Sequence, residues 1–444
     1  MKIGLYLQDL NNNACSERVF NKAMDKVKKS EADILVFPEC CYTPFKNLII
    51  YDDLFKDSGN EIPVISACLE LSKRIGKAIV FSSYDKFGTI FSIWCNYASS
   101  SNETRTKIYV KHTATDFSAF DFDDYKDGFG EEMFEPIVFK GKKIGLTICY
   151  DCNHSMFSRM YGVRGADIII NSTGGNVVYD KWHKFNKVRA VENHCFNFVT
   201  MGYHSDNNKN KKNSYVYGYS PEGKELPFEN LTVKTKNRNE IGSVYIYDTE
   251  SSDGKMEEDF SLNQEATVNK NINLYIPVGN VQSIINESRN IKRGIYSLKL
   301  PDGNNVIFCI VEGMDILKPE IVSDMLYCSE LKNIENKRYI IVNKHKNIDD
   351  EIYRCQLSDV LKVRAMENFC AVILESDKYN MCYQCGNNRT AQVVMPVNNN
   401  YGIDMKRTSG PEAIWKNKGN RMRASWREGY EWLIENVKEK EGLR

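Results

Sequence analysis

Hydrophobic and polar positions follow two different periods along the first part of the chain. Short apolar runs at residues 2–8, 32–39 and 78–85 are typical of buried strands. The segments between them, 16–30 and 64–77, carry apolar residues three and four positions apart, which predicts helices with one buried face. Strands that alternate with helices in this way indicate an α/β layered domain.

The same alternation continues through the middle of the chain. It predicts strands and helices at residues 141–148, 154–165, 166–173, 180–195 and 196–203. A further strand is expected at 243–250, and the stretch after it is charged and has no apolar period, which is typical of a linker. We therefore expect a first domain at 1–250, a linker at 251–270 and a second, smaller α/β domain at 271–444.

Two segments of the second domain resemble segments of the first. KVRAMENFC nearly repeats KVRAVENHC, and NNVIFCIVEGMD has the shape of KKIGLTICYDCN. Internal similarity of this kind predicts that the second domain is a degenerate partial repeat of the first, with chance similarity as the alternative. An ungapped alignment places Val311 where the first domain has Cys149, so the second copy would lack that thiol. A C-terminal helix is expected around residues 426–437.

Composition narrows the choice of partners and compartment. The 444 residues are 42% hydrophobic, which is enough for a substantial core, and 59 Lys and Arg balance 59 Asp and Glu. This balance gives no overall attraction to nucleic acid or to an anionic membrane. The first residues do not resemble a signal peptide, and no apolar run reaches the roughly 18 residues of a membrane span. We expect a cytoplasmic protein whose 14 cysteines are mostly reduced, buried thiols.

Three residues with useful chemistry lie at the ends of predicted strands. Cys149 follows the strand at 141–148, where backbone N–H groups of the next helix are expected to favour the thiolate. Glu39 ends the strand at 32–39, and Lys111 follows the alternating segment KIYV. The carboxyl ends of parallel strands are where ligands bind in α/β sheets. Each residue alone is more often structural, but the three together form a candidate site.

At these positions the sequence resembles the nitrilase, or carbon–nitrogen hydrolase, superfamily. The motifs that carry the resemblance are FPE, YVK and ICYD, followed by R-x-x-x-x-x-GAD, and the similarity covers residues 1–250. Members of that superfamily have an α-β-β-α sandwich and a Glu-Lys-Cys triad. The resemblance implies that Glu39 is the general base, that Lys111 stabilises the oxyanion, and that Cys149 is the nucleophile that forms a thioester.

The resemblance also suggests supporting residues and a substrate class. Members carry a second glutamate between the Lys and the Cys, for which we prefer Glu131 to Glu132 or Glu135. The backbone N–H of Tyr150 is the expected second oxyanion donor, and Asp151 is expected to support the site. The CYD sequence is similar to that of amidases and carbamoylases rather than nitrilases. The resemblance therefore implies hydrolysis of an amide or carbamoyl C–N bond, without a metal or cofactor.

Other interpretations remain open at this stage. Cys149, Cys152, Cys382 and Cys385 form two Cys-x-x-Cys pairs that could bind zinc, although the pairs lie far apart in the sequence. NSTGGN lacks the Gly-Lys-Ser/Thr of a phosphate-binding loop, and no basic and aromatic stripe indicates nucleic acid. The same thioester would permit acyl transfer, and a non-catalytic scaffold is the alternative to an enzyme. The expected partner is a small-molecule amide or carbamoyl compound, and assembly as a homo-oligomer or an internal pseudo-dimer is a hypothesis.

Overall fold

The chain divides into two compact units in the computed structural model. The first unit spans Met1–Met256 and the second spans Glu257–Arg444. The predicted linker at 251–270 lies outside the described residues. The described residues are 1–7, 17–39, 63–84, 90–113, 131–174, 177, 179–202, 216–230, 243–250, 294–346, 348–349, 356–376, 378–397, 400–411 and 424–442.

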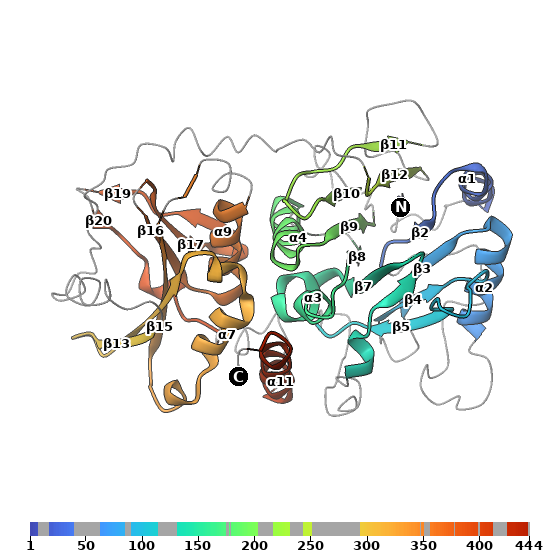
Figure 1. Ribbon diagram of the computed structural model, residues 1–444. Coiled ribbons are helices and arrows are strands. Elements are labelled where there is room, and N and C mark those ends of the chain that lie inside the picture. Colours follow the sequence, from blue (N-terminus) through green and yellow to red (C-terminus); the bar gives the residue numbers. More distant parts are fainter. Residues whose placement is uncertain are drawn as a thin grey trace. The chain divides into compact units, whose positions relative to one another are not determined.

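Two sheets form the centre of the first unit (Figure 1). The first has the strand order β11 (Phe228–Asn230), β12 (Val244–Asp248), β1 (Lys2–Tyr6), β2 (Ile34–Val36), β3 (Ala78–Tyr84), β4 (Ile90–Cys95) and β5 (Thr106–Val110). The second has the strand order β10 (Val216–Tyr219), β9 (Phe196–Met201), β8 (Ile168–Thr173), β7 (Lys142–Ile148) and β6 (Ile137–Phe139). Parallel pairs lie inside each sheet, from β1 to β3 and from β7 to β9.

Two helices cover the outer face of the first sheet. They are α1 (Glu17–Lys29) and α2 (Pro63–Ile75), and both agree with the predicted helical periods. Phe20 and Met24 of α1 lie in one apolar cluster with Leu35 of β2. Each helix therefore buries one stripe of apolar side chains against the sheet, as an amphipathic helix does.

The second sheet carries its own pair of helices, α3 (Ser155–Gly162) and α4 (Tyr179–Asn193). They pack on β7 and β9. The two sheets are joined by direct contacts, including the hydrogen bond that the Ser172 hydroxyl donates to the Phe37 carbonyl at 2.9 Å. The layers are thus helix, sheet, sheet and helix, which confirms the predicted sandwich.

A single larger sheet dominates the described part of the second unit. Its strand order is β13 (Gly294–Lys299), β14 (Asn305–Glu312), β15 (Lys337–His345), β16 (Ala371–Ser376), β17 (Asn380–Cys385) and β18 (Ala391–Val393). A short hairpin pairs β19 (Pro396–Val397) with β20 (Asn400–Tyr401). The predicted second α/β unit is therefore present.

Helices accompany this sheet. They are α7 (Pro319–Tyr327), α9 (Ser358–Asn368) and α11 (Ala424–Lys440). Helix α9 packs on β16 and β17, and α11 packs on α7. Leu433 and Val437 of α11 are buried, as the predicted C-terminal helix requires. No helix in the described ranges is long and apolar enough to cross a membrane.

Short 3-10 turns occur in both units. They are η2 (Glu131–Phe134), η3 (Cys149–Asn153), η5 (Gly313–Leu317), η6 (Ser329–Leu331), η8 (Asn387–Arg389) and η9 (Met405–Arg407). Two of them occupy equivalent places: η3 follows β7 in the first unit, and η5 follows β14 in the second. The first residue of each turn has a positive φ, 45° at Cys149 and 54° at Gly313.

The second unit repeats the strand pairing around these turns. In both units an antiparallel neighbour precedes two parallel pairs, and an antiparallel strand follows, so β6–β10 corresponds in pairing to β13–β17. Asn171 and Asn343 fix the register, because each donates its side-chain amide to the carbonyl that begins the turn, that of Cys149 at 3.4 Å and that of Gly313 at 2.9 Å.

The alignment of Val311 with Cys149 is therefore wrong. Val311 pairs with Asn343 across the sheet, just as Thr147 pairs with Asn171. Val311 thus matches Thr147, and the residue at the position of Cys149 is Gly313. The ungapped alignment matched the two apolar strands from their first residues. The turns that follow the strands show instead that Gly313 is the residue equivalent to Cys149, so the alignment was shifted by two positions.

Candidate active site

Glu39 and Lys111 form a buried ion pair beyond the ends of two strands of the first sheet. Glu39 follows β2, and Lys111 follows β5, where its backbone N–H still bonds to the Ile90 carbonyl of β4 at 2.9 Å. The Lys111 ammonium donates to Oε1 of Glu39 at 2.7 Å, and the two side chains are only 2% and 6% exposed. Oε2 accepts the backbone N–H of Gly174 at 2.8 Å. Both carboxylate oxygens are thereby fixed in place.

Cys149 sits on the sharp turn between β7 and η3. Its φ of 45° lies in the left-handed region, which a residue with a side chain seldom adopts. The turn is held from β8, because the Asn171 amide bonds both the Cys149 carbonyl and the Thr147 hydroxyl. The structure brings Glu39, Lys111 and Cys149 together, because each interacts electrostatically with the other two.

The protonation of this group differs from the expected thiolate. Burial, followed by the charge and hydrogen bond of Glu39, raises the pKa of the Cys149 thiol well above its ordinary value, and Lys111 opposes this only in part. Burial acts against the charged form of Lys111, but Glu39 and Cys149 outweigh it and raise the pKa of the ammonium. The expectation of a thiolate favoured by a helix start is wrong, since the thiol is enclosed beside a carboxylate.

Asp151 lies two residues after Cys149 and is fully buried. Burial raises the pKa of its carboxyl to about 6, against the opposing effects of Lys111 and of hydrogen bonds from Thr113, Tyr109 and Ile148. Asp151, the predicted supporting residue, therefore lies within electrostatic reach of Lys111. Tyr109 and Thr113 were not among the predicted residues, although their places two positions before and after Lys111 put them on the same face of an extended chain.

Tyr150 and its aromatic neighbours lie beside the turn η3, which Cys149 begins. The Tyr150 ring is half-buried, with ring centroids 5.6 Å from His154 and 6.1 Å from Trp182. Trp182 comes from the first turns of α4, far from Cys149 in sequence, so no local motif could have indicated it. Three aromatic rings therefore cluster beside the turn that Cys149 begins.

The second glutamate has no assigned place. Glu131 begins η2, but its side chain is outside the described part of the structure. Glu132 and Glu135 are exposed, so neither has the enclosed setting that a site carboxylate needs. The preference for Glu131 stays a prediction.

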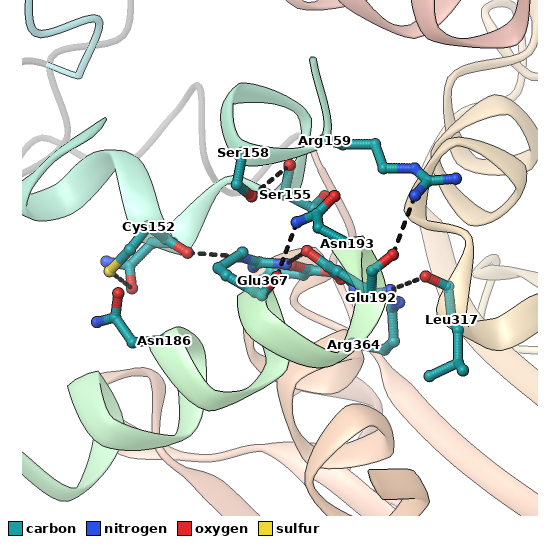
Figure 2. Close-up of polar contacts among 12 residues, drawn as sticks. Cys152, Ser155, Ser158, Arg159, Asn186, Glu192, Asn193, Leu317, Arg364 and Glu367 are labelled. Atoms are coloured by element: carbon teal, nitrogen blue, oxygen red, sulfur yellow. Dashed lines mark hydrogen bonds and ion pairs between the residues drawn. The ribbon is translucent and has the colours of Figure 1, made fainter. Parts of the chain in front are cut away.

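An arginine from α4 holds the C-terminal part of the turn η3. Nε of Arg189 donates to the Cys152 carbonyl at 2.8 Å, and Nη1 pairs with the Glu192 carboxylate. Figure 2 shows Cys152, Glu192 and Arg159, whose Nη1 donates to the Glu192 carbonyl at 3.0 Å. Burial also raises the pKa of the Cys152 thiol, to about 12.

An arginine makes equivalent contacts in the second unit. Nε of Arg364 donates to the Ile316 carbonyl at 3.0 Å, and Nη1 pairs with Glu367 at 2.6 Å (Figure 2). Asn368 then bonds the Arg364 carbonyl at 3.0 Å, as Asn193 bonds that of Arg189 at 2.8 Å.

The zinc interpretation finds no support in the geometry. Cys382 and Cys385 lie on β17, where a separation of three positions directs side chains to opposite faces of the sheet. Within the described residues, no three His, Cys, Asp or Glu side chains are grouped so that they could hold a metal ion.

Comparison with known proteins finds a family match within the first unit. Residues 14–224 match the carbon–nitrogen hydrolase family. The matched residues lie within the first unit. No curated protein sequence matches the chain.

Solved structures of an amidase and of other carbon–nitrogen hydrolases are also similar to this chain. An amidase from Nesterenkonia sp. has 15% identity and a TM-score of 0.38, and the alignment covers 56% of this chain and 89% of the amidase. A carbon–nitrogen hydrolase from Helicobacter pylori G27 has 17% identity, a TM-score of 0.38 and coverage of 56% and 90%. Nit3 from Saccharomyces cerevisiae, of branch 10 of the nitrilase superfamily, has 16% identity, a TM-score of 0.38 and coverage of 55% and 88%.

Proposed function

We propose that the first unit hydrolyses an amide or carbamoyl C–N bond through a thioester on Cys149. The observation that carries this proposal is the Glu39 carboxylate, which is fixed by the Lys111 ammonium at 2.7 Å and contributes to the raised pKa of Cys149. A carboxylate that faces an un-ionised thiol can accept its proton as the sulfur attacks a carbonyl carbon. The substrate on this proposal is a small amide or carbamoyl compound.

In the acylation half, the Cys149 sulfur forms a bond to the carbonyl carbon while its proton passes to Glu39. The Lys111 ammonium and the Tyr150 backbone N–H stabilise the oxygen that becomes negative. One such donor typically lowers the barrier by about 2.7–4 kcal/mol. The tetrahedral intermediate then breaks its C–N bond, and the departing nitrogen takes the proton from Glu39 and leaves as ammonia or an amine.

In the deacylation half, water attacks the thioester carbon and gives a proton to Glu39. The same two donors stabilise the second oxyanion. When the C–S bond breaks, the sulfur recovers the proton from Glu39, and a carboxylic or carbamic acid leaves. Glu39 thus alternates between base and acid, and neither half needs an external oxidant or cofactor.

Labelling and turnover together test this proposal. Iodoacetamide should alkylate Cys149 in preference to the other cysteines, which peptide mass spectrometry can quantify. Cys149→Ala should abolish ammonia release from every reactive member of a panel of simple amides and N-carbamoyl compounds. Cys328 is half-buried in the second unit, so Cys328→Ala serves as the matched control that removes a competing thiol and should keep full activity.

Three results separate the possible outcomes. A hydroxamate formed when hydroxylamine is added would identify acyl transfer from the same thioester. Activity that survives Cys149→Ala would refute the thioester. Absence of both alkylation and turnover in the wild-type protein would favour the non-catalytic scaffold.

We also propose that the second unit is a partial copy of the first, without the nucleophile. Four matching details support this: the strand pairing, the positive φ at Cys149 and Gly313, the Asn171 and Asn343 contacts, and the arginine that holds each turn. A fifth detail lies on α4 and α9, where His183 bonds Tyr219 at 2.9 Å and Ser358 lies 3.4 Å from the hydroxyl of Tyr383. Both tyrosines belong to the antiparallel strand that follows the repeated segment.

An experimental structure would test the partial copy directly. Residues 305–376 should superpose on 142–201, with the Cα of Gly313 on that of Cys149. A superposition that instead aligned Val311 with Cys149, or that required a different strand order, would contradict the proposal.

A further inference from the structure

The Asp151 carboxylate is the meeting point of two segments of the first unit. Its Oδ1 accepts the Thr113 backbone N–H at 3.0 Å and the Thr113 hydroxyl at 2.8 Å. Its Oδ2 accepts the Tyr109 hydroxyl at 2.9 Å and the Ile148 backbone N–H at 3.2 Å. A carboxylate has about four acceptor positions, so this one is fully used by described donors.

The donors identify which segments are joined. Tyr109 and Thr113 stand two residues before and two residues after Lys111, so both bond Asp151 from the segment that carries the ammonium. Ile148 is the residue immediately before Cys149, and Asp151 itself belongs to the turn that Cys149 begins. One carboxylate therefore ties the Lys111 segment to the Cys149 turn.

The environment makes this connection stiff. Asp151 and Tyr109 are fully buried, and Thr113 is 1% exposed. Phe134 and Tyr161 pack against the Tyr109 ring at centroid distances of 6.4 Å each. Hydrogen bonds to a charged group in such surroundings are not weakened by competing water.

The second unit offers an internal comparison. Asp315 occupies the third position of η5, as Asp151 does in η3, but it is only half-buried. The described part of that unit contains no counterpart of β5 and its lysine, and the turn there begins with Gly313. The fully bonded carboxylate thus occurs in the unit that has both a lysine and a thiol to align.

We propose that Asp151 is a positioning residue that sets the place of the Lys111 ammonium relative to the Cys149 thiol. This inference rests on the proposed function for its role in turnover. Without the carboxylate, the four donors lose their common acceptor, and the Lys111 segment and the Cys149 turn can shift independently. A displacement of about 1 Å in such a group can cost about 100-fold in rate.

Asp151→Asn is the direct test, because it keeps the shape and removes acceptor capacity. We expect kcat for ammonia release to fall by about 10- to 100-fold while KM changes by less than about threefold, since substrate binding is not the step affected. Iodoacetamide should also alkylate Cys149 several times more slowly, because a displaced Lys111 no longer favours the thiolate. This second readout needs no substrate.

Single-donor variants guard against a variant that fails to fold. Tyr109→Phe and Thr113→Val each remove one hydroxyl donor and should give smaller losses in kcat. Combined with Asp151→Asn, either change should add little, because both act through the same carboxylate.

Each outcome has one meaning. If Cys149 of the wild-type protein is alkylated but no ammonia is released, the proposed hydrolysis is refuted. The role of Asp151 is then judged from the alkylation rates of the wild type and Asp151→Asn alone. Folded Asp151→Asn protein that alkylates at the wild-type rate, or purely additive losses with Thr113→Val, would overturn the positioning role.

Discussion

Gly174 supports Glu39, the proposed catalytic base, from the end of β8, and replacing it with alanine tests the geometry of the candidate site. Its backbone N–H donates to Oε2 of Glu39 at 2.8 Å. A Cβ built on Gly174 would stand 2.9 Å from the same oxygen, closer than side-chain atoms tolerate. Gly174→Ala must therefore displace the carboxylate by about 0.5 Å, since attractive contacts begin near 3.5 Å.

The size of the effect follows from the bond that is disturbed. A hydrogen bond to a charged group contributes about 1.5–3 kcal/mol. Since about 1.4 kcal/mol corresponds to a tenfold change in rate, loss of this bond predicts that kcat falls by about 10- to 100-fold. The displaced carboxylate still faces Lys111, so the ion pair should survive and the variant should fold.

Ammonia release and thermal unfolding, measured on the same preparations, check this prediction. Gly402→Ala is the matched control, because its added Cβ meets nothing within 4 Å, and it should behave as the wild type. If folded Gly174→Ala protein turned over at the wild-type rate, the placement of Glu39 would not depend on this contact, and its assignment as a tightly positioned base would be wrong.

Four further substitutions have distinct expected results. Lys111→Met leaves a buried carboxylate unpaired, so urea denaturation should show a loss of about 3–5 kcal/mol in the free energy of unfolding, whereas an unchanged midpoint would contradict the buried pair. Asp151 has a folded pKa of about 6, above its ordinary 3.8, so the folded state binds more protons in that window and stability falls as pH rises through it. Asp151→Asn lacks this titration. The free energy of unfolding of the variant, relative to that of the wild type, should therefore rise by up to about 3 kcal/mol between about pH 4 and 7, which urea denaturation at each pH would measure. Arg189→Lys and Arg364→Lys should each destabilise their own unit by about 1.5–3 kcal/mol in calorimetry. Only the former should slow alkylation of Cys149, and equal effects on alkylation would argue against separate roles.

The layered fold could be predicted because its strands and helices differ in apolar period. The runs at 2–8, 141–148 and 166–173 contain β1, β7 and β8, and the segment at 16–30 contains α1. The pairing of strands could not be predicted in the same way. β12 lies beside β1 although they are at opposite ends of the unit in sequence, because pairing is a long-range contact that local pattern does not encode.

The candidate site could be predicted where sequence motifs mark it and not elsewhere. Glu39, Lys111 and Cys149 each follow a strand in a recognisable local sequence, and the structure brings them together. Gly174 and Trp182 carry no such mark, since their importance arises from contacts with Glu39 and Tyr150 that exist only after folding. The expectation of a Cys149 thiolate was wrong for a related reason, because the burial of the thiol arises only when the chain folds.

On the proposal that the second unit is a partial copy, the positive φ shared by Cys149 and Gly313 bears on how the two units diverged. A side chain in the left-handed region costs roughly 1–2 kcal/mol, which glycine avoids, so the first unit keeps its cysteine against a local conformational preference. Codons for glycine and cysteine can differ by one base, so a thiol at Gly313 is genetically close. A thiol regained there would still lack a base and an ammonium among its described neighbours. Because the described part of the second unit has no counterpart of the sheet that carries Glu39 and Lys111, a simple reversion would restore the cysteine without the proposed reaction.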